Sequence, residues 1–366
     1  MLKLLKPGCQ LLNKERIGIV MKQEHIFHYR GEFKVEAGNT FSGFQLKYTT
    51  LGQLNKDRSN VVWVIHALTG NSDVTSWWPG LFEHNSPYDP KDHFIICVNT
   101  LGGCYGSTGP LSVNPKTDKP YFHDFPLLTN RDVVQAFDLL RVDLGLDKVN
   151  TIIGSSLGGQ QALEWSIQRP EVFEHLVLIA CNAFHSPWGI AFNEAQRLAI
   201  EADASWKEND ARAGSNGIIA ARAVAMLSYR SFNGFSERQS EQDSGKTDDY
   251  RSSSYLRYQG KKLADRFNAF TYWILSKAMD NHHVGRNRES IESALGKIKA
   301  RTLVIGIESD ILFPLSEQKF LAENIHKAKL EVIHSLYGHD GFLVEFDQLK
   351  KLLYNFYQTK HSTILL

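Results

Sequence analysis

A five-residue stretch near the middle of the chain constrains its fold more than any other feature of the sequence. Residues 154–158 read Gly-Ser-Ser-Leu-Gly, after the mostly apolar run 149–153 and before a stretch of helical character, 159–165. A serine between two such glycines, at the junction of a buried strand and a helix, is typical of a sharp turn that raises the serine above a sheet on a strained backbone. The glycines remove side chains that would collide there. We therefore expect Ser156 to be a nucleophile at the carboxyl edge of a parallel sheet.

Two later segments end in residues that could complete a catalytic triad. A serine on such a turn is followed in the chain first by an Asp or Glu and then by a His. The buried-strand pattern 302–307 ends shortly before Asp310, and the strand pattern 330–333 ends shortly before His339. Catalytic residues of open α/β sheets lie just beyond the carboxyl ends of strands. We therefore predict Asp310 and His339 as the partners of Ser156.

Glu308 and His334 are the nearest rivals, because each also follows a strand pattern closely. Phe313-Pro314 gives the segment after Asp310 the character of a loop, and glycines bracket His339 in a flexible turn. These features favour Asp310 and His339.

Composition excludes several classes of partner. The 366 residues include 41 basic and 40 acidic side chains, a formal net charge of +1, so no bulk charge attracts nucleic acid or an anionic membrane. No apolar run approaches the ~18 residues of a membrane span, and none at the N-terminus suits a signal peptide. Met21 offers an alternative start. The scattered cysteines, without metal-like spacing, fit a reducing cytoplasm: Cys9, Cys97, Cys104 and Cys181.

No sequence motif for a bound cofactor or metal is found. His and Cys residues do not cluster at ligand spacing, no phosphate-binding loop ending in Gly-Lys-Ser or Gly-Lys-Thr is present, and Gly102-Gly103 lacks the surroundings of a dinucleotide fingerprint. We therefore expect no bound cofactor and no metal.

The strand and helix patterns predict an α/β core that is interrupted by a helical insertion. Strand and helix patterns alternate up to residue 182 and resume near Arg301. The intervening stretch is too long for a loop, and helical patterns occur in it at 192–202, 217–227 and 263–279, with a polar linker at 236–254. We expect an N-terminal, disordered extension at 1–27, a core formed by 28–182 and 300–366, and a cap at 183–299.

Several separate blocks resemble one known family, the homoserine O-acetyltransferases of the α/β-hydrolase superfamily. The resemblance covers nearly everything from about residue 28 onward, and its most specific blocks are 66–70, 99–110, 124–126, 154–165 and 337–343. It departs from the family at Leu157, usually Met, and at His283, commonly Asp. The resemblance implies an α/β-hydrolase fold, a mostly parallel central sheet with the helical cap inserted before the strand that carries Asp310.

The resemblance also implies an activity, namely transfer of an acetyl group from acetyl-CoA to the hydroxyl of L-homoserine in methionine biosynthesis. Ser156 would carry the acetyl group in a ping-pong cycle, and the backbone N–H groups of Leu68 and Leu157 would form the oxyanion hole. Arg222 and Tyr229 are seven residues apart, about two turns of a helix. Because the family has a substrate-binding Arg and Tyr at this spacing, both are expected to bind homoserine, with Arg222 on its carboxylate.

Asp340, next to His339, is expected to meet the ammonium group of homoserine. The family further implies a homodimer packed through the cap helices. Three alternatives stay open: succinyl-CoA as donor, L-serine as acceptor, and a carboxylesterase in which water takes the acyl group. Paired charge recognition by Arg222 and Asp340 argues against the esterase.

Overall fold

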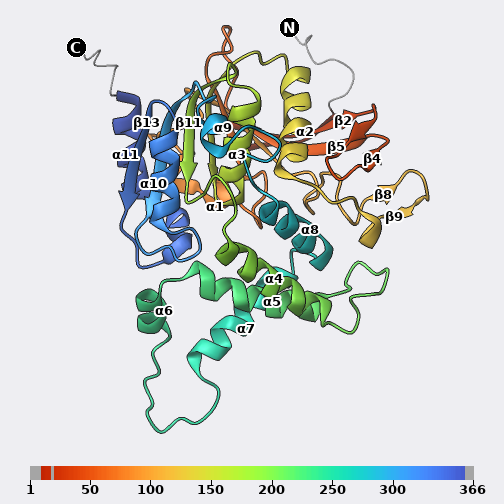
Figure 1. Ribbon diagram of the computed structural model, residues 1–366, viewed down its shortest axis with the longest axis vertical. Coiled ribbons are helices and arrows are strands. Elements are labelled where there is room, and N and C mark those ends of the chain that lie inside the picture. The colour runs from red at the N-terminus through yellow and green to blue at the C-terminus, as the bar shows by residue number, and fades with distance from the viewer. Residues whose placement is uncertain (1–9, 18–19, 359–366) are drawn as a thin grey trace.

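A nine-stranded sheet forms the centre of the computed structural model, which describes residues 10–17 and 20–358 (Figure 1). From β7 to the far edge at β13 all neighbours are parallel, whereas the β1, β2 and β5 side is antiparallel. The predicted mostly parallel sheet is confirmed. In spatial order the strands are β1 (Gln10–Ile17), β2 (Val20–Tyr29), β5 (Phe44–Leu51), β7 (Phe94–Val98), β6 (Val61–Ile65), β10 (Val149–Ser155), β11 (Phe173–Ile179), β12 (Arg301–Ile307) and β13 (Ala328–Ile333).

Helices cover both faces of this sheet. All five residues of β6 are buried, and their side chains alternate between two apolar clusters, Trp63 on one face and Val64 on the other. The first face is covered by α2 (Asn130–Asp143), α3 (Leu157–Gln168), α9 (Ile291–Leu295) and α10 (Leu315–Asn324). The second is covered by α1 (Val74–Trp77), the 3₁₀ helix η1 (Pro79–Leu81) and α11 (Phe346–Gln358).

Short elements complete the core. They are β3 (Phe33–Lys34) paired with β4 (Thr40–Phe41), β8 (Val113–Asn114) paired with β9 (Lys119–Pro120), and the 3₁₀ helices η2 (Phe122–Asp124) and η3 (Gly338–Leu343). Helix α2 begins with a capping box, since the Thr129 hydroxyl accepts from the Asp132 N–H while the Asp132 carboxylate accepts from the Thr129 N–H.

The N-terminal segment differs from its prediction. We expected residues 1–27 to be an extension outside the fold, but β1 and most of β2 lie within this range and extend the sheet. Strand β2 pairs with β5 from Lys22 to Tyr29, and its alternate residues His25 and Phe27 are both buried. The backbone of β5 supplies the hydrogen-bond partners of β2. The sequence of residues 10–27 is only weakly apolar, so by itself it does not indicate that this segment joins the sheet. Residues 1–9 lie outside the described residues.

Five of the helices between β11 and β12, all but α9, form the part of the chain that projects from the core (Figure 1). They are α4 (Pro187–Glu201), α5 (Ser215–Tyr229), α6 (Phe232–Gln239), α7 (Arg251–Ala264) and α8 (Ala269–Asp280). In Figure 1, α6 and α7 lie farthest from the sheet, with α8 next to it. We call α4 to α8 the cap. The domain boundaries at residues 182 and 300 stay a prediction.

Two local predictions for the cap need correction. The helix expected at 263–279 is divided into α7 and α8, because the Asn268 side chain accepts the N–H of Thr271 and starts a new helix there. The linker expected at 236–254 begins inside α6 and ends inside α7. Ser231 caps α6 by accepting the N–H of Gly234.

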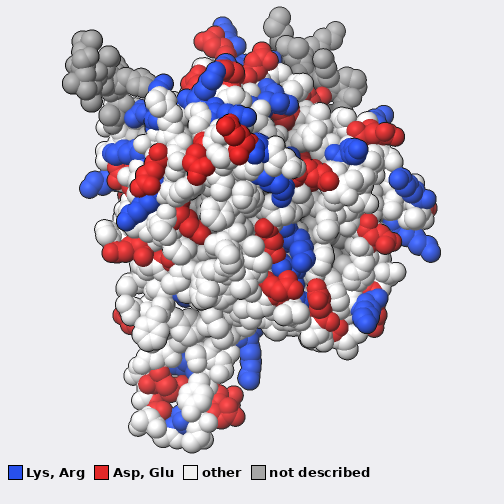
Figure 2. Space-filling view, in the orientation of Figure 1, with Lys and Arg blue, Asp and Glu red and all other residues white. Residues whose placement is uncertain are grey.

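Positive and negative side chains are interspersed over the face of the molecule shown in Figure 2, in keeping with the net charge of +1. Within residues 10–17 and 20–358, no helix combines the length and the apolar content that a membrane crossing requires.

Candidate active site

Ser156 stands on the predicted turn, between the end of β10 and the first residue of α3. Its backbone has φ 54° and ψ −125°, a conformation that a residue with a side chain rarely adopts. Close packing holds it there: a Cβ atom on Gly154 would lie 2.2 Å from the carbonyl oxygen of Gly158, and one on Gly158 would lie 2.2 Å from that of Ile65. The two glycines thus let β10, β6 and α3 approach closely enough to present Ser156.

Asp310 and His339 lie together beyond the ends of β12 and β13. His339 Nδ1 donates to Asp310 Oδ2 over 2.6 Å, and both side chains are buried. Asp310 Oδ1 accepts the backbone N–H groups of Leu312 (2.8 Å) and Phe313 (2.9 Å). These bonds fix the carboxylate, and the carboxylate fixes the imidazole with Nε2 as the atom available to take a proton.

Aromatic side chains surround the His339 ring. Phe313 stacks on it with centroids 5.0 Å apart, Phe342 meets it edge-on at 5.4 Å, and Tyr229 of the cap lies 5.7 Å away. Burial by itself lowers the pKa of His339, but the charge and hydrogen bond of Asp310, with the charge of Asp340, outweigh it and raise that pKa above its usual value. His339 is therefore a stronger base than a free histidine.

The rival residues pair with each other at the surface. His334 Nδ1 and Glu308 Oε2 are 2.6 Å apart, and their side chains are 75% and 64% exposed. A proton shared there is open to water, whereas the Asp310–His339 pair is enclosed, so the enclosed pair is the one suited to act on a serine.

The two backbone N–H groups predicted for the oxyanion hole have no acceptor in the chain. Among the described residues, neither Leu68 nor Leu157 donates its N–H to another group. The loop with Leu68 is held by His66, whose Nδ1 donates to the Ala67 carbonyl (2.8 Å) while its Nε2 accepts the N–H of Thr100 (3.2 Å). Burial lowers the pKa of His66 to about 4, so its ring is neutral near pH 7 and can make both bonds.

Arg222 and Tyr229 lie on the same helix, α5, and contact each other. The Arg222 guanidinium carbon is 5.2 Å from the Tyr229 ring centroid, and that ring in turn faces His339. Arg222 is half-buried, and no carboxylate among the described residues pairs with it. A cation that lacks an anionic partner is thus placed one aromatic ring away from the base.

Comparison with known proteins identifies the family. The family model for the α/β-hydrolase fold matches residues 60–346. A homoserine O-acetyltransferase of Cyclobacterium marinum is 49% identical over 346 residues, which cover 94% of this chain and 98% of that protein. The chain belongs to the homoserine O-acetyltransferase family. The family resemblance, the fold class and the assignment as an enzyme made from the sequence are thereby confirmed.

Solved structures share the fold of this member of the homoserine O-acetyltransferase family. A homoserine O-acetyltransferase from Bacillus anthracis has a TM-score of 0.87 at 24% identity, covering 94% of this chain and 99% of that one. An acetylester hydrolase from Corynebacterium glutamicum has a TM-score of 0.81 at 23% identity, covering 91% and 96%. The same fold therefore carries both transfer and hydrolysis, and only the site can distinguish them.

Asp340, which we predicted to meet the ammonium group of homoserine, already has a cationic neighbour within the chain. Arg230 Nη1 lies 3.2 Å from Asp340 Oδ2, and the two side chains are only 23% and 14% exposed. Arg230 also donates from Nε to the Tyr255 hydroxyl (3.3 Å). Sequence reasoning missed Arg230, although it directly follows Tyr229. Asp340 keeps lone pairs for a second cation.

The departure from the family at His283 lies away from these residues. His283 forms an isolated β-bridge with Phe184, their rings are 5.7 Å apart, and its carbonyl accepts from Arg131. This places His283 where the chain enters and leaves the cap. Among the residues that the structure describes, no group of three His, Cys, Asp or Glu side chains is placed to hold a metal ion.

Proposed function

We propose that this enzyme transfers the acetyl group of acetyl-CoA to the hydroxyl of L-homoserine, a step of methionine biosynthesis, through an acetyl-Ser156 intermediate. The observation that carries the proposal is the half-buried Arg222, unpaired among the described residues and one aromatic ring away from a histidine that a buried aspartate orients. Water as acceptor needs no such cation, whereas the carboxylate of an amino acid does.

In the first half of the cycle, His339 takes the proton of the Ser156 hydroxyl, and Ser156 Oγ attacks the thioester carbonyl. The negative charge on the carbonyl oxygen is stabilised by the N–H groups of Leu68 and Leu157, each worth about 3 kcal/mol in such sites. When the tetrahedral intermediate collapses, the C–S bond breaks, the imidazolium of His339 returns its proton to the leaving sulfur, and CoA departs.

In the second half, His339 removes the proton of the homoserine hydroxyl, which attacks the acetyl-Ser156 ester. Arg222 binds the substrate carboxylate with two N–H groups, and Asp340 accepts from the ammonium. Collapse breaks the ester bond, His339 protonates Ser156 Oγ, and O-acetylhomoserine leaves. Tyr229 packs between Arg222 and His339 and sets the spacing of the acceptor from the base.

The cap favours transfer over hydrolysis. Cap residues Tyr229, Leu263 and Tyr272 pack in one apolar cluster with Leu68, Leu157 and Phe313 from the core. Such a cover limits the water that can reach the acetyl ester before the acceptor does.

Thiol release by the purified protein tests the proposal. Acetyl-CoA or succinyl-CoA would each be supplied with L-homoserine, with L-serine or with no acceptor, and Ser156→Ala would serve as the inactive control. We expect fast release only with acetyl-CoA and L-homoserine together. Equal release with and without acceptor would show that water is the acceptor and would refute the transferase proposal.

We further propose that two chains pack through their caps. The cap exposes several large apolar side chains, more than a lid in water requires: Trp188, Leu198, Leu227, Phe232, Tyr250 and Tyr258. Light scattering should give twice the mass of 41.5 kDa, and Phe232→Lys should shift it toward the monomer. A monomeric parent chain would refute this packing.

A further inference from the structure

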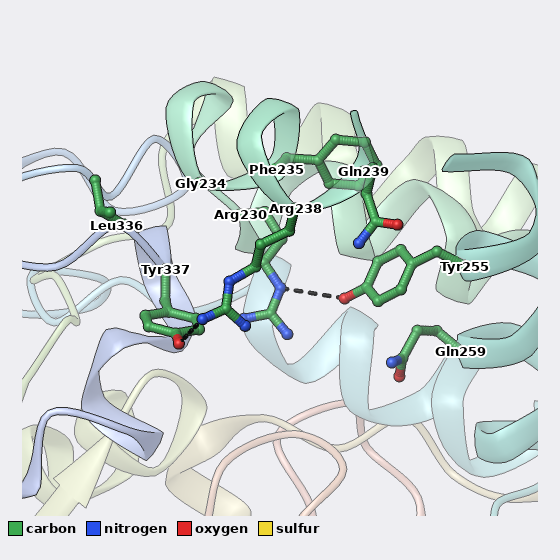
Figure 3. A pocket seen from close by; sticks show the side chains of 9 residues that line it. All are labelled: Arg230, Gly234, Phe235, Arg238, Gln239, Tyr255, Gln259, Leu336 and Tyr337. Carbon is green, nitrogen blue, oxygen red and sulfur yellow. Dashed lines mark hydrogen bonds between the residues drawn. The ribbon is translucent and has the colours of Figure 1, made fainter. Parts of the chain in front are cut away.

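A cavity of about 240 Å³ lies where the cap meets the loop that leads to His339 (Figure 3). It is enclosed by the end of α5, by α6 and α7, and by residues 336–337 after β13. Its polar lining consists of Arg230, Arg238, Gln239, Tyr255, Gln259 and Tyr337. Nothing in the mechanism above uses this cavity or Arg238.

The cavity is positively charged. Arg230 and Arg238 both lie against the Tyr337 ring, with guanidinium carbons 5.8 and 4.4 Å from its centroid, and Arg238 also donates to the Tyr337 hydroxyl (Figure 3). No Asp or Glu lines the cavity. Asp340 compensates Arg230 from one side, but Arg238 has no carboxylate partner among the described residues.

Neutral donors complete the set. Tyr255 accepts from Arg230, so its own hydroxyl proton remains available to a ligand. The amides of Gln239 and Gln259 line the same space (Figure 3). Two guanidinium groups together with hydroxyl and amide donors match the oxygen-rich, dianionic surface of a phosphate group.

The cavity is held at a defined place relative to the catalytic loop. Ser231 donates to the Leu336 carbonyl (2.5 Å), and a Cβ atom on Gly234 would lie 1.9 Å from that carbonyl oxygen. Gly338, at φ +62°, approaches Ser231 so closely that a Cβ atom there would lie 2.7 Å from the Ser231 nitrogen. The start of α6 is thus docked on the residues that immediately precede His339.

We propose that Arg230 and Arg238 bind the phosphate groups of the acyl-CoA donor in this cavity. The inference rests on the proposed function, because it takes a CoA thioester as the donor. The volume of the cavity is below the ~300–1,000 Å³ of pockets that enclose a whole drug-sized ligand. The cavity therefore receives a phosphate group and not the whole CoA molecule. CoA carries its phosphates at the far end of a flexible pantetheine arm, which lets the thioester reach Ser156 while the phosphates stay at the cap.

Donor analogues that lack phosphates test the site. We would measure kcat/KM for acetyl-CoA, for acetyl-dephospho-CoA and for S-acetylpantetheine, with the parent enzyme, with Arg238→Gln and with Arg257→Gln. Arg257 is a matched control, because it is exposed on α7 between Tyr255 and Gln259 but does not line the cavity.

We expect Arg238→Gln to lower the preference for acetyl-CoA over S-acetylpantetheine by about ten- to a hundredfold, the worth of a hydrogen bond to a charged group. Arg257→Gln should keep the parental preference. If Arg238→Gln lowers kcat/KM for acetyl-CoA but not for acetyl-dephospho-CoA, the 3′-phosphate is the group bound. If it lowers kcat/KM for both donors, the diphosphate is the group bound. An unchanged preference in Arg238→Gln would overturn the proposal, whether both kcat/KM values stay at the parental level or both fall by the same factor.

Direct binding separates this inference from the proposed function. Calorimetric titration of CoA into Ser156→Ala measures the site without any turnover, and the Ser156→Ala, Arg238→Gln double variant should bind CoA at least about tenfold more weakly. That result would uphold the phosphate site even if homoserine were not the acceptor. Equal CoA binding by both variants would overturn the site while leaving the transferase assay unaffected.

Discussion

At the scale of single residues, Asp310 determines how strong a base His339 is. The two side chains share a buried 2.6 Å hydrogen bond, and the charge of Asp310 raises the pKa of His339 against the effect of burial. His339 must be neutral to accept a proton, so activity should fall as the pH drops through this raised pKa. The acid limb of the pH–rate profile is therefore expected above the usual 6.5 of a histidine.

Replacing Asp310 with Asn should lower kcat/KM by roughly 10³–10⁴-fold, as the loss of an orienting carboxylate does in related triads. The acid limb should also move to lower pH, because burial then acts on His339 with less opposition. Thiol release measured from pH 5 to 9 checks both effects. Glu308→Gln removes a carboxylate from the exposed His334 pair and should preserve the parental profile. Similar losses in the two variants would contradict the assignment of the triad.

Arg222 acts at the same scale but in the other half of the cycle. Arg222→Gln keeps much of the side-chain volume and removes the charge that we assign to the homoserine carboxylate. We expect KM for homoserine to rise about ten- to a hundredfold, while KM for acetyl-CoA stays near the parental value. Steady-state kinetics with each substrate varied in turn measure both constants. A rise confined to the acetyl-CoA constant would mean that Arg222 serves the donor.

At the scale of elements, the turn between β10 and α3 depends on glycine for space. In Gly158→Ala the new Cβ atom would lie 2.2 Å from the Ile65 carbonyl oxygen, so β6 and α3 must move apart. We expect unfolding to become easier by about 1–3 kcal/mol or more, together with loss of activity as the Leu157 N–H shifts. Urea unfolding and thiol release measure the two effects.

Gly296→Ala is the matched control for this element. Gly296 is exposed at the end of α9, with φ −62°, and the nearest atom to its added Cβ would be the Glu292 carbonyl oxygen at 3.3 Å. Stability there should be unchanged or slightly higher. If Gly158→Ala behaved like Gly296→Ala, the close packing at the elbow would not be needed.

At the scale of the whole molecule, buried neutral histidines should make the fold sensitive to acid. Burial lowers the pKa of four histidines to about 3 or 4, namely His25, His66, His185 and His282. Between these values and the ~6.5 of an unfolded chain, the unfolded state binds more protons, so stability is present above pH 6.5 and is lost as the pH falls. Three carboxyl groups oppose this trend, because burial raises the pKa of Glu317 to about 7 and also raises the pKa of Asp132 and of Asp280. More groups follow the trend, since the pKa of His175 and of carboxylates such as Glu36, Asp73 and Asp138 is lowered as well.

Thermal unfolding followed by circular dichroism at pH 7.5, 6.5, 5.5 and 4.5 should therefore show a Tm that falls steadily below pH 6.5. His282 donates to the Asn182 carbonyl, a bond that glutamine can also make, so His282→Gln should reduce the slope. His326 is exposed, and His326→Gln should keep the parental slope of Tm against pH. A Tm independent of pH over this range would contradict the prediction.

The sequence by itself determined the features that depend on neighbours along the chain. The turn at Ser156, the buried runs of the parallel strands and the helical nature of the insertion all follow from backbone geometry and side-chain periodicity within a few residues. For the same reason, the residues predicted for the site come after the strands that carry them, in the required order. The resemblance to the homoserine O-acetyltransferases added the expected substrate-binding roles of Arg222 and Tyr229, which side-chain periodicity does not indicate.

Only the tertiary structure decided which distant residues meet. It enclosed Asp310 with His339 and left Glu308 with His334 in water, although all four follow strand ends. It joined Arg230 to Asp340, placed β2 on the edge of β5 with β1 beyond it, and gathered Arg238 and Tyr337 around a cavity. These contacts join segments far apart in the chain, and their energies come from burial and charge in a packed interior. A sequence pattern of a few residues therefore cannot predict them.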